Sequence, residues 1–319
     1  MTSLLILLTL PEPVRMQYYN HLRKTFPELN VNMVDRHDKV GPHIATADIL
    51  LTFGPMMADH VVAAASNLKW IQALGSGVDG IVDLPSLRED VMVTNLHGIQ
   101  AAPVSEAAMM AMLALSRGLP RTVRSQDRHK WDRFPARLLK DKTVGIFGIG
   151  LIAEELAPKC KAFGMTVVGI TSAIRPVPGF DRMHSRDELE QAVRELDYLV
   201  LLTPYSAATR GIVSEKVLAA MKPSSYLVNL ARGGVVDEPA LIKALQEGRI
   251  AGAALDVFTQ EPLPEDYPFW NMERVLITPH LGGFCDVYVD QALPVVERNI
   301  RGFLSGERGR MVNVVKEGV

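Results

Sequence analysis

A glycine-rich turn at residues 143–153, with the sequence TVGIFGIGLIA, constrains the fold of this chain more than any other stretch. An apolar run enters it, Gly148, Gly150 and Ala153 form a G-x-G-x-x-A pattern, and the residues that follow have a helical pattern. Backbone N–H groups and the helix dipole at such a turn attract an anion, and a side chain on either glycine would block a pyrophosphate. The stretch predicts a dinucleotide site, although similar turns also serve packing alone.

Short apolar strands alternate with helical stretches on both sides of this turn. Such βα repeats predict an α/β fold in which parallel sheets carry helices on both faces. A length of 319 residues favours two domains over one. The expected strands are residues 4–10, 31–34, 48–53, 70–74 and 91–95 before the turn, and 165–170, 198–202, 225–230, 252–257 and 275–278 after it.

Three other segments bear on how the chain is organised. Residues 101–118 are rich in Ala, Met and Leu, which indicates a buried helix that links domains or forms a dimer contact. Residues 121–140 are charged and irregular, but contain Trp131 and Phe134. This arm is either a surface connection or a subunit interface, where aromatic anchors are common. Residues 287–304 form a predicted helix that packs back on the first domain.

Charge and cysteine usage exclude several classes of protein. The net charge of −2 gives no basic field for nucleic acid or an anionic membrane. Cys160 and Cys285 are too few for a disulfide framework, and no Cys/His cluster has metal-ligand spacing. The apolar residues 4–10 lack a positive flank and run into prolines, so they predict a strand and not a signal peptide. We expect a soluble, cytoplasmic protein with no metal.

Ligands of a doubly wound sheet bind at the carboxyl ends of its strands, so those ends are the candidate sites. After residues 165–170 come Thr171, Ser172 and Arg175, with no acidic residue to bind the ribose 2′-hydroxyl of NAD. Hydroxyl groups and an arginine suit a 2′-phosphate, which favours NADP modestly over NAD. A plain loop with a solvated arginine is the alternative. The next strand is followed by Thr203, Pro204 and Thr209, which could also form only a cap and a turn.

Four charged or titratable residues end the later strands. Arg232 stands between small residues, where a guanidinium needs an anion: either a substrate carboxylate or an internal ion pair. Asp256 interrupts an apolar run, and Glu261 follows in a proline-rich loop. Each could be only a cap or a solvated carboxylate. His280 lies beside glycines at the same expected sheet edge. A carboxylate beside an imidazole favours its protonated form, which would make this pair an acid–base group.

Together these segments resemble the D-isomer-specific 2-hydroxyacid dehydrogenases over nearly the whole chain. The nucleotide turn, the arginine segment LVNLARGGVVDEPAL, the glutamate segment AALDVFTQEPLPEDYPFW and the histidine segment ITPHLGG occur in the family's order and spacing. ALGSGVDGI resembles the loop that receives the substrate carboxylate, and GIQAAPVSEAAM the helix that leads into the nucleotide domain.

The resemblance implies a role for each matching residue. Arg232 would bind the substrate's carboxylate and carbonyl oxygens, and His280 would donate a proton to the carbonyl as hydride arrives from the nicotinamide. Glu261 would keep His280 protonated, and Asp256 would contact the nicotinamide carboxamide. The residues expected to bind substrate are Ser76, Gly77, Arg232 and His280, and those expected to bind cofactor are Gly148, Gly150, Leu151, Ile152, Thr171, Ser172, Arg175, Thr203, Pro204, Thr209, Leu230, Ala231, Asp256 and Gly282.

The resemblance also implies the domain plan and the reaction. Residues 1–96 and 286–319 would form a flavodoxin-like substrate domain, and residues 97–285 a Rossmann domain with a dimer arm at 121–140. The expected reaction is NAD(P)-dependent reduction of a small 2-ketoacid, of glyoxylate or hydroxypyruvate type, by a homodimer. Pro158 departs from the pattern, because it falls in the helix after the glycine turn and should kink it.

Other functions fit parts of the pattern. A phosphite or formate dehydrogenase would share the fold, but the family's formate enzymes pair the histidine with a glutamine. A dinucleotide-sensing corepressor would keep the same residues, although this chain lacks long disordered tails. A methyltransferase could use the glycine turn for S-adenosylmethionine, but would leave Arg232 and His280 without a role.

Overall fold

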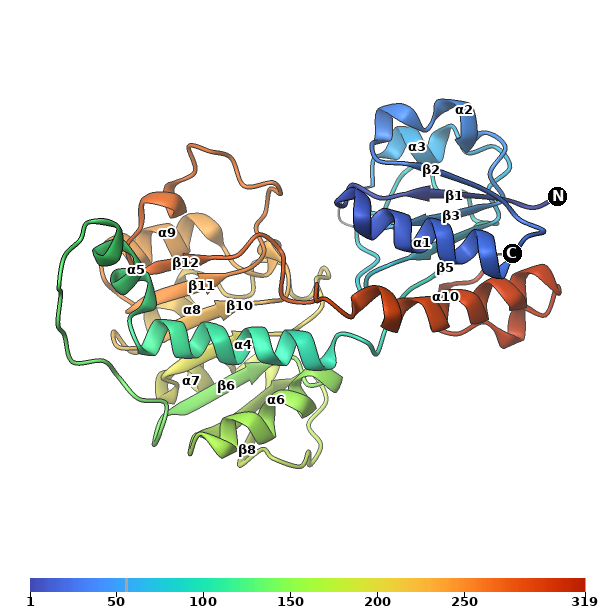
Figure 1. Ribbon diagram of the computed structural model, residues 1–319. Helices are drawn as coiled ribbons and strands as arrows, with labels where there is room; N and C mark the ends of the chain where they lie inside the picture. Colours follow the sequence, from blue (N-terminus) through green and yellow to red (C-terminus); the bar gives the residue numbers. More distant parts are fainter. Residues whose placement is uncertain (55–56, 319) are drawn as a thin grey trace. The chain divides into compact units, whose positions relative to one another are not determined.

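The computed structural model describes residues 1–54 and 57–318, which form two compact units. Met1–Ile99 and Asp286–Val319 make up unit 1, and Gln100–Cys285 make up unit 2 (Figure 1). Among the described residues, no helix is both long and apolar enough to cross a lipid bilayer.

Unit 2 is built on a seven-stranded parallel sheet in the order β12-β11-β10-β9-β6-β7-β8. Counted from β6, the order is 3-2-1-4-5-6-7, the doubly wound arrangement in which ligands bind where the order reverses, here between β6 and β9. Because all paired strands run parallel, their carboxyl ends share one edge. The strands are β6 (Thr143–Phe147), β7 (Thr166–Thr171), β8 (Arg182–Ser185), β9 (Tyr198–Leu201), β10 (Tyr226–Asn229), β11 (Gly252–Leu255) and β12 (Val275–Ile277).

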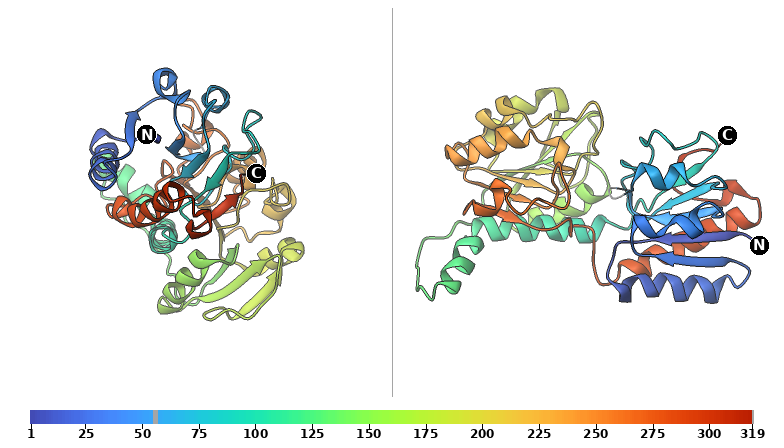
Figure 2. Two further views of the ribbon diagram at one scale, coloured as in Figure 1. Left: turned by 90° about the vertical axis from the view of Figure 1, so that its right-hand side faces the viewer. Right: turned by 90° about the horizontal axis from the view of Figure 1, so that it is seen from above.

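Two hydrophobic cores cover the faces of this sheet. On one face α4 (Ala101–Ser116) and α6 (Leu151–Ala162) pack side by side, because small Ala side chains on both helices allow close approach (Figures 1 and 2). The other face is covered by α7 (Leu189–Ala192), α8 (Glu215–Ala220) and α9 (Glu238–Gln246). Pro158 lies inside α6, and the helix continues through it to Ala162.

The arm between α4 and β6 differs from the irregular segment that its charge pattern predicts. Its first part forms α5 (Leu119–Asp127), which begins after Gly118 in a left-handed conformation with φ of +65° and has a proline in its first turn. Arg121 then pairs with Asp132 at 2.7 Å and lies over the Phe134 ring. The sequence pattern missed this helix because α5 is short, mostly polar and buries none of its residues.

Unit 1 has a six-stranded sheet in the order β13-β5-β4-β3-β1-β2. In chain order β1 to β5 follow the flavodoxin arrangement 2-1-3-4-5 and run parallel, as expected, and β13 adds to the β5 edge in the antiparallel direction. The strands are β1 (Ser3–Leu7), β2 (Asn30–Val34), β3 (Ile49–Thr52), β4 (Trp70–Ala73), β5 (Met92–Thr94) and β13 (Val314–Lys316).

The helices of unit 1 lie on both faces of its sheet (Figure 1). A core beneath α2 (Gly41–Ile44) and α3 (Asp59–Ala63) covers one face. On the other, α1 (Glu12–Thr25) packs beside α10 (Tyr288–Leu304), and His21 of α1 pairs with Glu297 of α10 at 2.7 Å. The predicted helix at residues 287–304 therefore packs on unit 1.

Candidate active site

The two glycines of the turn after β6 have different structural requirements. Gly148 has φ of +103°, and a Cβ there would lie 2.5 Å from the backbone nitrogen of Thr203, so both conformation and packing exclude a side chain. Gly150 has an extended backbone, is exposed, and has no atom within 4 Å of the position of a Cβ. Packing within unit 2 therefore does not explain the second glycine.

Gly150 is also the residue that caps α6, and within the described residues no side-chain hydrogen bond caps the first amides of that helix, at Leu151 and Ile152. Free N–H groups at a helix N-terminus, beside an open position without a side chain, are the features that a bound pyrophosphate requires. The turn therefore fits a dinucleotide cofactor.

The end of β7 carries the residues expected to select the cofactor. Arg175 is exposed, and its guanidinium lies 2.7 Å from the Glu154 carboxylate in the first turn of α6. Thr171 accepts a weak hydrogen bond from the Ala173 amide, and Ser172 is exposed. Sequence reasoning missed Glu154, although its place directly after the G-x-G-x-x-A pattern was a usable signal.

Thr209 shapes the turn that follows β9. Its hydroxyl donates to the Pro204 carbonyl at 2.7 Å and accepts from the Ser206 amide at 2.8 Å, and the residue is 3% exposed. Thr203 is also buried and packs against Gly148. The hydroxyl of Thr209 is thus engaged in holding the loop next to the glycine turn.

Arg232 follows β10 and is held by the buried side chain of Asn229. The Asn229 amide donates to the Arg232 carbonyl at 3.0 Å, and its oxygen accepts from the Ala231 amide at 3.1 Å. The Arg232 guanidinium donates to the Ala231 carbonyl at 2.7 Å and is partly exposed. Leu230, which precedes this segment, is partly buried and faces α4. Asn229 was not recognised from the sequence, where it reads as the last residue of an apolar strand.

Glu261 and His280 form a hydrogen-bonded pair. Nδ1 of His280 lies 2.7 Å from Oε2 of Glu261, while Oε1 of Glu261 accepts from the Phe258 amide at 2.9 Å. Burial raises the pKa of Glu261, but the hydrogen bond and charge of His280, the Phe258 amide and the charge of Arg232 lower it below its ordinary value. The structure thus brings Arg232, Glu261 and His280 into one electrostatic group.

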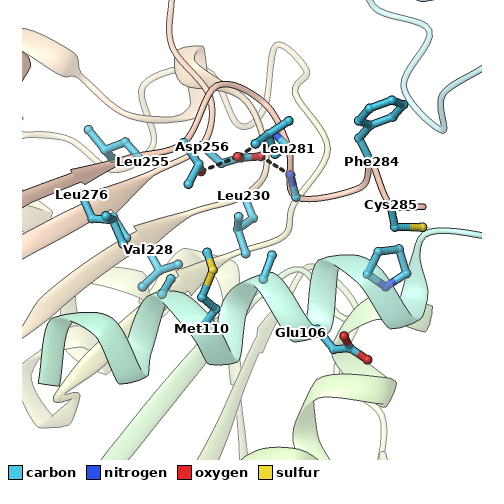
Figure 3. A pocket seen from close by; sticks show the side chains of 16 residues that line it. Glu106, Met110, Val228, Leu230, Leu255, Asp256, Leu276, Leu281, Phe284 and Cys285 are labelled. Atoms are coloured by element: carbon cyan, nitrogen blue, oxygen red, sulfur yellow. Dashed lines mark hydrogen bonds between the residues drawn. The ribbon is translucent and has the colours of Figure 1, made fainter. Parts of the chain in front are cut away.

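Asp256 organises the loop that presents His280. Its carboxylate accepts from the Thr278 hydroxyl at 2.5 Å and from the Leu281 and Gly282 amides at 2.8 and 2.9 Å (Figure 3). These bonds hold His280 in a left-handed conformation with φ of +52°. Asp256 is 4% exposed, and its side chain holds this loop in place. The resemblance implies in addition that Asp256 contacts the cofactor.

A pocket of about 430 Å³ lies between α4 and the ends of β10, β11 and β12. Figure 3 shows Met110 of α4 on one wall and Asp256 across from it. The lining is mostly apolar and includes Leu230, Asp256 and Gly282, three of the residues expected to contact the cofactor.

Ser76 and Gly77, the residues expected to bind the substrate carboxylate, belong to unit 1, where they follow β4. The Asn95 side chain donates to the Ser76 carbonyl at 2.6 Å, and Tyr288 donates to the Leu74 carbonyl. Gly54 packs beneath the same loop, since a Cβ there would lie 3.2 Å from the Gly77 carbonyl. The amides of Ser76 and Gly77 donate no hydrogen bond within the described part of unit 1, so they are available to bind an anion.

Residues 109–282 match the family model "D-isomer specific 2-hydroxyacid dehydrogenase, NAD binding domain". A D-3-phosphoglycerate dehydrogenase of Methanocaldococcus jannaschii is 35% identical over 268 residues, 83% of this chain and 51% of that protein. The chain therefore spans about half the length of the curated relative.

Solved structures match over nearly the full chain. A D-isomer specific 2-hydroxyacid dehydrogenase family protein from Aeromonas salmonicida has a TM-score of 0.86 and 30% identity, covering 98% of both chains. An NADPH-dependent glyoxylate/hydroxypyruvate reductase from Sinorhizobium meliloti, in complex with NADP and sulfate, has a TM-score of 0.83 and 27% identity, covering 99% of this chain and 98% of that one.

Proposed function

Because this chain belongs to the D-isomer specific 2-hydroxyacid dehydrogenase family, we propose that it reduces a small 2-ketoacid to the D-2-hydroxyacid. The observation that carries this proposal is the hydrogen bond between His280 and Glu261 in unit 2, with the charge of Arg232 acting on the same carboxylate. In carbonyl reduction a cation can stabilise the negative charge that develops on the oxygen, and a held imidazole can donate the proton.

In this proposal NAD(P)H supplies the hydride, and the chain's own residues manage charge and protons. Arg232 binds the carboxylate and carbonyl oxygens of the ketoacid and stabilises negative charge as it develops on the carbonyl oxygen. Glu261 holds Nδ1 of His280 and so fixes the ring, with Nε2 as the atom that donates a proton to that oxygen. The amides of Ser76 and Gly77 bind the substrate carboxylate.

The cofactor is proposed to bind along the carboxyl edge of the unit 2 sheet. The uncapped N-terminus of α6 and the open position at Gly150 support a pyrophosphate site. Arg175 and the hydroxyl groups of Thr171 and Ser172 support a preference for NADP over NAD, because no acidic residue ends β7. The NADP-bound reductase from Sinorhizobium meliloti supports the same leaning.

Steady-state kinetics with NADH and NADPH against a panel of 2-ketoacids tests this function. We expect turnover with glyoxylate or hydroxypyruvate, and a larger kcat/KM with NADPH. The panel includes 3-phosphohydroxypyruvate, since relatives are named D-3-phosphoglycerate dehydrogenases. Dinucleotide binding without turnover of any ketoacid would contradict the proposal and favour a dinucleotide-sensing corepressor. Turnover of phosphite alone would place the chain elsewhere in the family.

We also propose that the arm at residues 121–140 contacts a second copy in a homodimer. Trp131 is 92% exposed, and Leu138 and Val123 nearby are also exposed, which is unusual for large apolar side chains on a solvated surface. Light scattering on wild type and Trp131→Ser tests the arm, with a monomer expected for the variant.

Cys160 and Cys285 are unpaired, so we expect a reducing, cytoplasmic setting.

A further inference from the structure

The loop that carries Glu261 lies between β11 and η6 (Pro268–Asn271) and forms no strand or helix of its own. Its apolar side chains are anchored by Phe269, which is 1% exposed and contacts the rings of both Phe258 and Tyr267. Polar contacts add to this ring packing and bear on the position of Glu261.

Glu238 supplies those contacts from outside the loop. It is the first residue of α9, is 6% exposed, and accepts from the Thr259 amide through Oε1 and from the Tyr267 hydroxyl through Oε2, both at 2.6 Å. A buried carboxylate is stable only when its oxygens are well paired, and such charge-assisted bonds are short and strong. One side chain thus holds both ends of the segment 259–267.

The Thr259 amide is next in the chain to the amide that holds Glu261. Phe258 donates its N–H to Oε1 of Glu261 at 2.9 Å, and Thr259 donates to Glu238. The same backbone rests on Gly233, where a Cβ would lie 1.9 Å from the Phe258 carbonyl carbon. A shift at Thr259 would therefore move the donor that orients the Glu261 carboxylate.

Burial and the hydrogen bond to Glu238 also change the pKa of Tyr267. Burial first, and then the bond and the negative charge of Glu238, raise the pKa of Tyr267 to about 12. The hydroxyl therefore stays protonated, and remains a donor, across the range in which an enzyme is assayed.

We propose that Glu238 is a positioning residue for the acid–base pair: through Thr259 and Tyr267 it fixes the loop on which Glu261 meets His280. This inference rests on the proposed function. In the described part of unit 2 the Glu238 carboxylate is bonded to Thr259 and Tyr267, and its effect on the reaction passes through Glu261.

The test compares Tyr267→Phe and Glu238→Gln with Glu215→Gln, in which an exposed carboxylate paired with Lys243 of α9 is neutralised. Tyr267→Phe deletes a single donor and keeps the ring contact with Phe269, so it should fold. We expect kcat to fall about tenfold in Tyr267→Phe and in Glu238→Gln, with the KM for the dinucleotide within twofold of wild type. Glu215→Gln should match wild type.

A double-mutant cycle separates positioning from plain loss of stability. In a Glu261→Gln background, Tyr267→Phe should cost less than a further twofold in kcat, because the residue it positions is already disabled. An equal tenfold loss in both backgrounds would overturn the proposal, and so would a kcat within twofold of wild type in both single variants.

A readout without turnover keeps this inference separate from the proposed function. In a ¹³C NMR titration of the Glu261 carboxyl, Tyr267→Phe should raise the pKa of Glu261, because the carboxylate loses its alignment with His280 and the Phe258 amide. An unchanged Glu261 titration would contradict the positioning role. If wild type reduces no ketoacid while the Glu261 shift is observed, the proposed function fails and the positioning stands.

Discussion

Two corners of unit 2, both at the carboxyl edge of its sheet, are built in opposite ways. The acid–base corner consists of Arg232, Glu261 and His280, and buried side chains hold its loops: Asn229, Glu238 and Asp256 are 1%, 6% and 4% exposed. The ribose corner consists of Thr171, Ser172 and Arg175 with Glu154, and in its ion pair the Arg175 and Glu154 side chains are 53% and 39% exposed.

This difference separates what each corner can do. Buried, hydrogen-bonded supports fix the distances between groups, which proton transfer requires. An exposed ion pair contributes only about 0–1 kcal/mol, so Arg175 can leave Glu154 for another anion at little cost. We therefore expect changes in the acid–base corner to alter the chemical step, and changes in the ribose corner to alter the choice of cofactor.

The largest expected effect is the loss of the proton donor. His280→Asn should lower kcat by about 10²–10⁴-fold while dinucleotide binding stays within twofold. Asparagine tolerates the left-handed conformation at this position, so the loop held by Asp256 should persist. Stopped-flow reduction and fluorescence titration measure the two quantities, with His184→Asn, at a partly buried histidine of β8 that pairs with Glu195, as control. A kcat above one tenth of wild type would contradict the role of His280.

Alanine substitutions at the two glycines of the turn should affect different properties: cofactor binding at Gly150 and stability at Gly148. Gly150→Ala should leave the Tm unchanged, since its Cβ meets open space, but should raise the Kd for NADPH about tenfold. Gly148→Ala should lower stability by about 1–3 kcal/mol, because its Cβ overlaps the backbone of Thr203. Thermal melts and binding titrations check both. Unimpaired NADPH binding in Gly150→Ala would contradict the proposal that the pyrophosphate binds at this turn.

A smaller effect is expected at the ribose corner. Arg175→Ala should lower kcat/KM for NADPH about tenfold and leave the value for NADH within twofold, because only the 2′-phosphate loses its partner. Glu154→Gln should raise kcat/KM for NADPH up to about fivefold by releasing Arg175. Glu155→Gln, which affects a neighbouring exposed pair with Lys159, is the matched control. A larger kcat/KM with NADH in wild type, together with no effect of Arg175→Ala, would refute the NADP preference.

The smallest expected effect is a shift in the pKa of Glu261. Because the folded-state pKa of Glu261 is lowered, the stability that its interactions contribute is present above the unfolded pKa and is lost as pH falls through the lower folded value. His280→Asn removes the main interactions that offset burial, so the pKa of Glu261 should rise. A ¹³C NMR titration measures this rise. No change, or a fall, would mean that His280 does not stabilise the Glu261 carboxylate.

The sequence predicted the fold class and the family, and both are confirmed. Parallel strands bring their carboxyl ends to one edge, so grouping Arg232, Asp256 and His280 needed only the strand pattern. The exposed helix α5 and the short strands β8 and β13 were not predicted, because they are short and none of their residues is buried, so no long apolar pattern marks them. The antiparallel pairing of β13 was also not foreseen.

Of the supporting residues, Asp256 was predicted from the sequence, whereas Asn229 and Glu238 could not be found there. Glu238 meets Thr259 and Tyr267 across 21 and 29 residues of chain, and only the path of the loop decides that contact. Glu154 in the first turn of α6 meets Arg175, which follows β7, across 21 residues of chain, although its place directly after the glycine pattern was a usable signal. The catalytic and cofactor roles, including those of Ser76 and Gly77 in unit 1, stay predictions.

The most direct test of the separation between the two corners is kcat/KM for NADPH and for NADH, at saturating ketoacid, in Glu261→Gln and Arg175→Ala. Glu261→Gln should lower both values by the same factor and so keep the wild-type NADPH-to-NADH ratio. Arg175→Ala should lower that ratio about tenfold. A changed ratio in Glu261→Gln, or equal losses with both cofactors in Arg175→Ala, would contradict the separate roles assigned to the two corners.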